Sequence, residues 1–86
     1  MNQRLSLPVS VISIFDHKTR LVKPLRVLFE GRAYEIVKIG YHHTYRTGRV
    51  LYHIFSVASD NLFFRLNLDT ESLFWTLEEV SDGESN

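Results

Sequence analysis

The chain has 86 residues, with ten Lys/Arg, ten Asp/Glu and no cysteine. This length suits one domain, and the lack of cysteine excludes disulfides, iron-sulfur clusters, thiolate zinc sites and cysteine nucleophiles. The net charge of zero combines +6 for residues 1–53 (nine Lys/Arg, three acids) with −6 for residues 54–86 (one Lys/Arg, seven acids). This split either creates a basic surface for an anionic partner or is neutralised between interleaved strands.

The first predicted element is a strand over residues 5–15, where Leu5, Leu7, Val9 and Val11 alternate onto one face. The polar, basic connection "DHKTRLVK" follows it. Serines interrupt the apolar stretch and no long hydrophobic run follows, so we expect neither a signal peptide nor a membrane span. We therefore expect a cytoplasmic protein.

A second strand is expected to begin at Pro24, a position where no ladder donor is needed. Gly31-Arg32 suits a type II′ hairpin turn, because glycine takes its first central position. This turn pairs Phe29 with Tyr34 and Val27 with Ile36. Five apolar residues then share one face: Leu25, Val27, Phe29, Tyr34 and Ile36.

Asp60-Asn61 predicts the next hairpin turn, and the resulting register sorts the side chains by face. It pairs Val57 with Phe64, Phe55 with Leu66, His53 with Leu68, Ser56 with Arg65, and Ile54 with Asn67.

A loop formed by residues 69–72 then returns the chain. It sets Leu66 against Trp75 and Phe64 against Leu77, and places Leu73 on the inward face with Trp75.

These patterns predict an all-β fold: about six antiparallel strands in a meander, forming a small, partly open β-barrel without substantial helix. The domain is expected to span residues 1–80. Residues 81–86 contain no apolar anchor and are expected to be a disordered tail.

Residues 39–55, "IGYHHTYRTGRVLYHIF", predict a hairpin with a four-residue loop at 45–48 and Gly48 in the left-handed conformation. His42 then faces Leu51, and Gly40 faces His53. Because consecutive strand residues point to opposite faces, His42 and His43 cannot reach one metal ion. We therefore expect no metal site here. The His53 ring is expected to be satisfied by a hydrogen bond. If His42 lies beside a solvated loop, truncating it should cost little stability.

The sequence does not favour catalysis. No serine lies in a nucleophile-elbow pattern, and the glycines are too isolated for a phosphate-binding loop. Glu78 and Glu79 are expected on opposite strand faces, where neither perturbs the other. We therefore expect no enzyme, no cofactor and no metal.

A second apolar face is predicted by the same register, with Ile39 opposite Ile54 and Tyr41 opposite Tyr52. It would be covered by the first strand or by "DHKTRLVK", serve self-association, or stack a ligand. The residues of this candidate interaction face are Ile39, Tyr41, Tyr52, Ile54, Phe63 and Phe74.

Two segments carry a family resemblance: "PLRVLFEGRAYEIVKIG" and "NLFFRLNLDTESLFWTLEEV". Across residues 8–81 the chain resembles an uncharacterised family of small bacterial β-domains, which is similar to a C-terminal extension of some Y-family DNA polymerases. The resemblance implies a β fold and a faint link to nucleic acids. The residues that carry it are Pro24, Gly31, Arg32, Tyr34, Trp75 and Leu77.

We therefore expect a non-enzymatic protein-interaction or self-assembling module, with a homodimer as the simplest assembly and no membrane contact. The alternative is a nucleic-acid-associated module in which basic side chains meet phosphates and tyrosines stack on bases. A pI near 6.9 argues against that alternative. Its candidate contacts are Arg20, Lys23, Arg26, Tyr45, Arg46 and Arg49.

Overall fold

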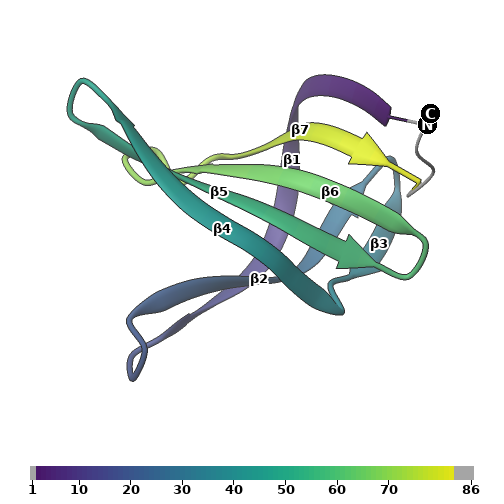
Figure 1. Cartoon of the computed structure of the whole chain (residues 1–86), viewed down its shortest axis with the longest axis horizontal. Helices are drawn as coiled ribbons and strands as arrows, with labels where there is room; N and C mark the ends of the chain where they lie inside the picture. Colours follow the sequence, from purple (N-terminus) through teal and green to yellow (C-terminus); the bar gives the residue numbers. More distant parts are fainter. Residues whose placement is uncertain (1, 83–86) are drawn as a thin grey trace.

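The computed structural model describes residues 2–82 and contains seven β-strands, with no helix in that range (Figure 1). The predicted all-β class is confirmed, with one strand more than the approximate six. The tail prediction for residues 83–86 lies outside the described residues, whereas Ser81 belongs to the last strand. The strands are β1 Asn2–Asp16, β2 Leu21–Phe29, β3 Arg32–Glu35, β4 Lys38–Thr47, β5 Val50–Ser59, β6 Leu62–Asp69 and β7 Trp75–Ser81.

The strands form one antiparallel sheet in the order β3-β2-β1-β7-β6-β5-β4. Two meanders, β1 to β3 and β4 to β7, are joined because the long strand β1 pairs with β7 through its first half and with β2 through its second. The edges of the sheet are therefore β3 and β4. This order gives a curled half-barrel, in agreement with the predicted partly open barrel.

The curl closes at one end and opens at the other. Two consecutive residues between β3 and β4 hydrogen-bond to different strands. Ile36 N donates to Leu25 O of β2 (2.9 Å), and Val37 N donates to Ala58 O of β5 (2.9 Å). A connection this short draws the two edges together. At the opposite end the β1–β2 and β4–β5 hairpins diverge (Figure 1).

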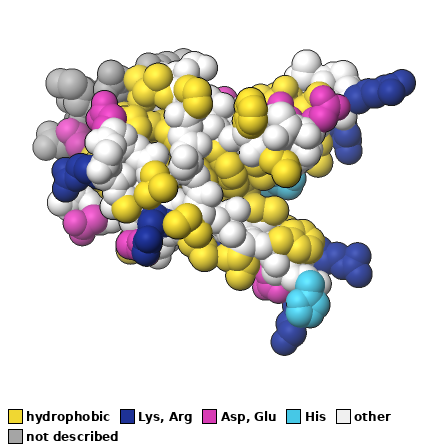
Figure 2. Space-filling view, turned by 180° about the vertical axis from the view of Figure 1, so that it is seen from behind, with side chains coloured by type: hydrophobic (Ala, Val, Ile, Leu, Met, Phe, Trp, Pro, Cys, Tyr) yellow, Lys and Arg dark blue, Asp and Glu magenta, His cyan; other side chains and the backbone are white. Residues whose placement is uncertain are grey.

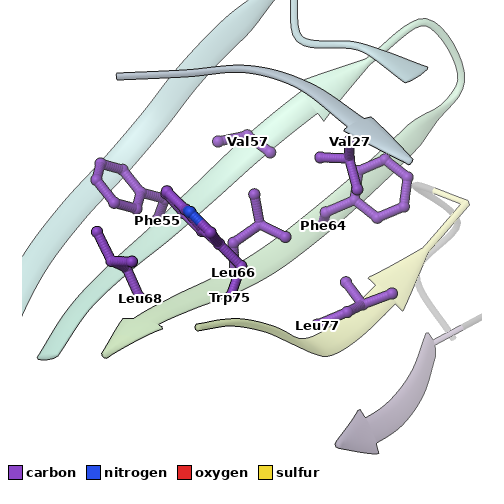
Figure 3. Packing of buried hydrophobic residues seen from close by; sticks show 8 residues of the cluster. All are labelled: Val27, Phe55, Val57, Phe64, Leu66, Leu68, Trp75 and Leu77. Atoms are coloured by element: carbon purple, nitrogen blue, oxygen red, sulfur yellow. The ribbon is translucent and has the colours of Figure 1, made fainter. Parts of the chain in front are cut away.

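The hydrophobic core lies on the concave face of the sheet. Inward residues of β5 and β6 alternate with outward ones, and the ring edges of Phe29 and Tyr34 pack against Phe64 at centroid distances of 6.3 and 5.3 Å. The buried cluster consists of Val27, Phe55, Val57, Phe64, Leu66, Leu68, Trp75 and Leu77 (Figure 3).

The hairpin around Asp60-Asn61 has the predicted register. All five expected pairs are present, including Val57 with Phe64 and Ile54 with Asn67. The alternation of apolar and polar residues was sufficient to predict this register, because a one-residue slip would have turned every core side chain outward.

The register of the β2–β3 hairpin differs from the predicted register by two residues. Its turn is Glu30-Gly31, with φ of 52° and 75°, which is the type I′ pattern rather than type II′ at Gly31-Arg32. Val27 consequently pairs with Tyr34 instead of Ile36. A two-residue shift keeps every side chain on its expected face, so Phe29 and Tyr34 still contact each other.

Pro24 lies inside β2 rather than at its start. The pairing with β1 shifts between Ile12 and Ser13, which leaves Leu25 as the extra residue of a β-bulge. The bulge turns Pro24 inward, where it is buried, and leaves Leu25 45% exposed. Leu25 therefore does not belong to the inward face expected for it.

The loop before β7 is also longer than predicted. Leu68, not Leu66, pairs with Trp75, and Leu66 pairs with Leu77. The loop extends through Phe74 because Leu73 adopts a φ of 65° and its N–H donates to Asp69 O (2.7 Å). Leu73 is consequently 69% exposed instead of facing the core.

The β4–β5 hairpin has a tighter turn than the predicted loop at 45–48. Thr47 pairs with Val50, which leaves Gly48 and Arg49 in the turn. Gly48 does adopt the predicted left-handed conformation, with φ of 61°. His42 faces Phe55 rather than Leu51, and Gly40 is bulged rather than opposite His53.

We expect Gly31→Ala to lower the free energy of unfolding by about 1–2 kcal/mol. A Cβ at Gly31 would meet nothing within 4 Å, so the cost arises from the left-handed backbone alone. The matched control is Gly40→Ala, where φ is not positive and the nearest contact, Ser56 O at 3.5 Å, is ordinary. Urea unfolding measures both, and equal losses of stability would contradict the type I′ assignment.

Candidate binding surfaces

Two hairpins project from the open end of the half-barrel. We call residues 13–24 the β1–β2 arm and residues 42–53 the β4–β5 arm. Figure 2 shows a deep cleft between two projecting lobes. Apolar atoms lie along the walls of the cleft, and Lys/Arg side chains lie at the tips of both lobes. Because that view is turned by 180°, the hairpins on the left of Figure 1 are these lobes.

The strand register defines the walls of the cleft. On the β1–β2 arm, Phe15 pairs with Val22 and shares the inward face of the buried Pro24. On the β4–β5 arm, the inward pairs are His42 with Phe55, Thr44 with His53, and Arg46 with Leu51. The loop after β6 supports this second arm, since Thr70 N and Oγ1 both donate to Leu51 O (3.1 and 2.7 Å).

Two histidines form a stacked pair on the inner wall. His42 Nε2 lies 2.8 Å from His53 Nδ1, and their rings are 5.0 Å apart and nearly parallel. His42 also stacks on Phe55 at 4.6 Å. Partial burial lowers the pKa of His53, and the charge of His42 lowers it further. The predicted hydrogen bond of His53 is confirmed, whereas His42 does not lie beside a solvated loop.

His43 leaves the opposite face, as predicted, and lies beside Tyr41 with ring centroids 5.1 Å apart. Within residues 2–82 no group of three or more His, Asp or Glu side chains is placed to hold a metal ion.

The acids nearest the arms face away from the cleft. Asp16 and Asp69 point to the outer face, and each closes a turn: Asp16 accepts from Lys18 N (2.9 Å), and Asp69 from Glu71 N (2.8 Å) and Ser72 N (3.1 Å). These backbone bonds lower the pKa of both carboxyl groups.

The outer face of β4–β7 carries a polar network. Tyr45 and Tyr52 stack at 4.9 Å, and Asn67 Nδ2 donates to Tyr45 Oη (3.2 Å) and to Glu78 Oε2 (2.8 Å). Burial raises the pKa of Tyr52, with a further contribution from Asp69. Tyr45 is therefore engaged within the fold and lies away from the cleft.

The predicted second apolar face is only partly assembled. Tyr41, Tyr52, Ile54 and Phe63 share the outer face, although Tyr41 pairs with Ser56 and Tyr52 with Tyr45. Because Gly40 is bulged, Ile39 pairs with the core residue Val57 instead of Ile54. Phe74 lies in the loop before β7.

The chain covers this face only in part, because Ile54 is buried while Tyr41 and Phe63 are exposed. Residues 16–23 form the tip of the β1–β2 arm and β1 lies beyond β7, so the expected cover by either segment is wrong. Tyr41 and Phe63 are 60% and 50% exposed. A groove of about 280 Å³ runs between Gly40 and Phe63.

Another exposed apolar surface, which the sequence did not predict, lies on the outer face of β1 and β2. Arg26, which is ion-paired with Glu35, lies opposite Ile12 on this surface. The available signal was the continuous apolar character of "VSVISIF", which places large side chains on both faces of β1. We call this surface the outer patch; its residues, 42–47% exposed, are Ile12, Ile14, Leu25 and Leu28.

The structure divides the basic and aromatic residues predicted to meet nucleic acid. Arg20 and Arg49 lie at the two arm tips and Arg46 lies on the inner wall. Lys23 faces outward beside Ile14, Arg26 pairs with Glu35, and Tyr45 belongs to the outer network. Sequence reasoning missed Phe15 and Lys18 at the cleft.

Comparison of the chain with protein-family models, with curated proteins and with solved structures finds no match. Residues 2–82 contain no helix with the length and apolar character that are needed to cross a membrane.

Proposed function

We propose that this protein is a non-enzymatic protein-interaction module that self-associates through the outer patch. The observation that supports this most strongly is the exposure of Ile12, Ile14, Leu25 and Leu28 side by side on one sheet face. Contiguous apolar surface that a chain leaves uncovered marks an interaction site more often than scattered exposed residues do.

The charges around the outer patch favour a second copy as the partner. Arg26 lies opposite Ile12 and Lys23 opposite Ile14, and Glu35 of β3 pairs with Arg26. In a two-fold dimer the same patch faces itself, so Lys23 of one copy is able to join the Arg26–Glu35 ion pair of the other. Apolar side chains beside arginine are common in such interfaces, where arginine is enriched.

We expect the double variant Ile12→Thr/Leu28→Thr to shift the protein toward monomer. Threonine retains strand propensity but reduces the apolar area that association would bury. Sedimentation equilibrium over a concentration series should show the unaltered protein approaching twice the chain mass and the variant remaining closer to one.

Val37→Thr is the control, because Val37 is 71% exposed but lies on the β3–β4 connection. It should dimerise like the unaltered protein. An unaltered protein that stays monomeric throughout the series would refute the proposal, as would equal effects of the two variants.

A further inference from the structure

We propose that the cleft between the β1–β2 arm and the β4–β5 arm binds single-stranded nucleic acid. The cleft faces the concave side of the sheet, whereas the outer patch lies on the convex side. This second activity is therefore independent of the proposed self-association.

The charge around the cleft is arranged for a polyanion. Lys18 and Arg20 lie at one tip, Arg49 at the other, and Arg46 on the inner wall. None of these side chains makes an ion pair with a described residue. Cations on both sides are able to follow a phosphate backbone along the opening.

Acids do not cancel this charge on the inner wall. Among the described strand residues, those facing inward on both arms include no Asp or Glu, since Asp16 and Asp69 are turned outward and held by backbone N–H groups. Asp/Glu side chains do lie on both lobes (Figure 2), so the basic character belongs to the inner wall rather than to the arms as a whole.

The walls supply surfaces on which bases can stack. Phe15 is 62% exposed on the inward face of its arm, and the opposite wall carries the parallel rings of His42 and His53. Val22 and Leu51 extend these walls with apolar surface. Stacking on aromatic side chains is tolerant of sequence because every base has a flat π face.

These features favour a single strand over a duplex or an acidic peptide. In a duplex the base faces are stacked on one another and cannot reach rings inside a cleft. An acidic peptide would satisfy the cations, but its carboxylates gain nothing from Phe15. A single strand matches both the cationic rim and the aromatic walls.

Fluorescence anisotropy with a labelled oligothymidylate tests this proposal across salt concentrations of about 50–200 mM. Arg46→Ala/Arg49→Ala should weaken binding and reduce the slope of log K against log salt by about 1.4, because each arginine–phosphate interaction contributes about 0.7 to that slope. The matched control is Arg32→Ala/Arg65→Ala, which removes the same charge at β3 and on the outer face of β6, and it should leave the slope unchanged.

Phe15→Ala tests the stacking separately. It should weaken oligothymidylate binding by about 5- to 150-fold without changing the salt slope, because one base loses its aromatic partner. Phe63→Ala is the control, since Phe63 is 50% exposed but lies on the outer face of β6. Thermal unfolding of each variant establishes that the fold is retained.

Three results would overturn the proposal. One is an unaltered protein that does not bind the oligonucleotide at about 50 mM salt, where attraction to phosphates is strongest. Another is equal weakening by the cleft variants and their controls. The third is polyglutamate displacing the oligonucleotide as effectively as unlabelled oligothymidylate does, which would make an acidic protein segment the ligand. Ile12→Thr/Leu28→Thr should bind normally, so failure of self-association is distinguishable from failure here.

Discussion

Replacing Trp75 with alanine should lower the free energy of unfolding by about 3–5 kcal/mol. Trp75 is only 9% exposed, pairs with Leu68 across the sheet, and lies 5.7 Å from Phe55 between ring centroids. Its removal leaves a cavity where the inward faces of β5, β6 and β7 meet (Figure 3). A chain of this length has a total stability of roughly 4–13 kcal/mol, so the loss is a large fraction.

Phe74→Ala is the control for Trp75→Ala, because it also removes an aromatic ring and is the adjacent residue. Phe74 is 73% exposed in the loop before β7, so its loss should change stability by less than about 0.5 kcal/mol. Urea unfolding followed by circular dichroism measures both variants. Comparable losses would mean that β7 begins at a different residue from the one the structure shows.

His42→Ala should lower the free energy of unfolding at pH 7.5 by about 1–3 kcal/mol. The variant removes the partner of His53 Nδ1 and the ring stacked on Phe55. His43→Ala is the matched control: His43 is exposed on the opposite face, and its loss should cost less. Equal effects would place His42 outside the core face. Urea midpoints at fixed pH provide the comparison.

The histidine pair also predicts the direction of the pH dependence. In the unfolded chain His53 has its ordinary pKa near 6.5, whereas burial and His42 lower it in the native state. As pH falls below about 6.5, the unfolded chain binds a proton that the native pair resists, so stability decreases. The decrease should be smaller in His42→Ala.

The two carboxyl groups with lowered pKa values contribute to the pH dependence of stability only at more acidic pH. The pKa values of Asp16 and Asp69 are lowered from 3.8, so the stability they contribute is lost only at pH values near and below that. Urea midpoints at pH 7.5, 6 and 5 therefore measure the histidine contribution without that of Asp16 and Asp69. A midpoint that rises on acidification through this range would contradict the arrangement of the pair.

The sequence by itself determined the class of fold, the inward faces of β5 and β6, and the left-handed glycine at position 48. These features follow from the two-residue period of a strand and from local turn chemistry, which neighbouring residues encode. The prediction that His42 and His43 point to opposite faces is confirmed for the same reason. The predicted hydrogen bond at His53 is confirmed as well.

Only the tertiary structure decided the registers that involve bulges and the surfaces that follow from them. The bulges at Leu25 and Gly40 each insert one residue into a ladder, which exposes Leu25 and turns Ile39 toward the core side. Pro24 and Gly40 are residue types that often accompany a bulge, but they do not determine by how many residues the pairing shifts. The cleft likewise exists because a two-residue connection closes one end of the half-barrel while the two arms, far apart in sequence, diverge at the other.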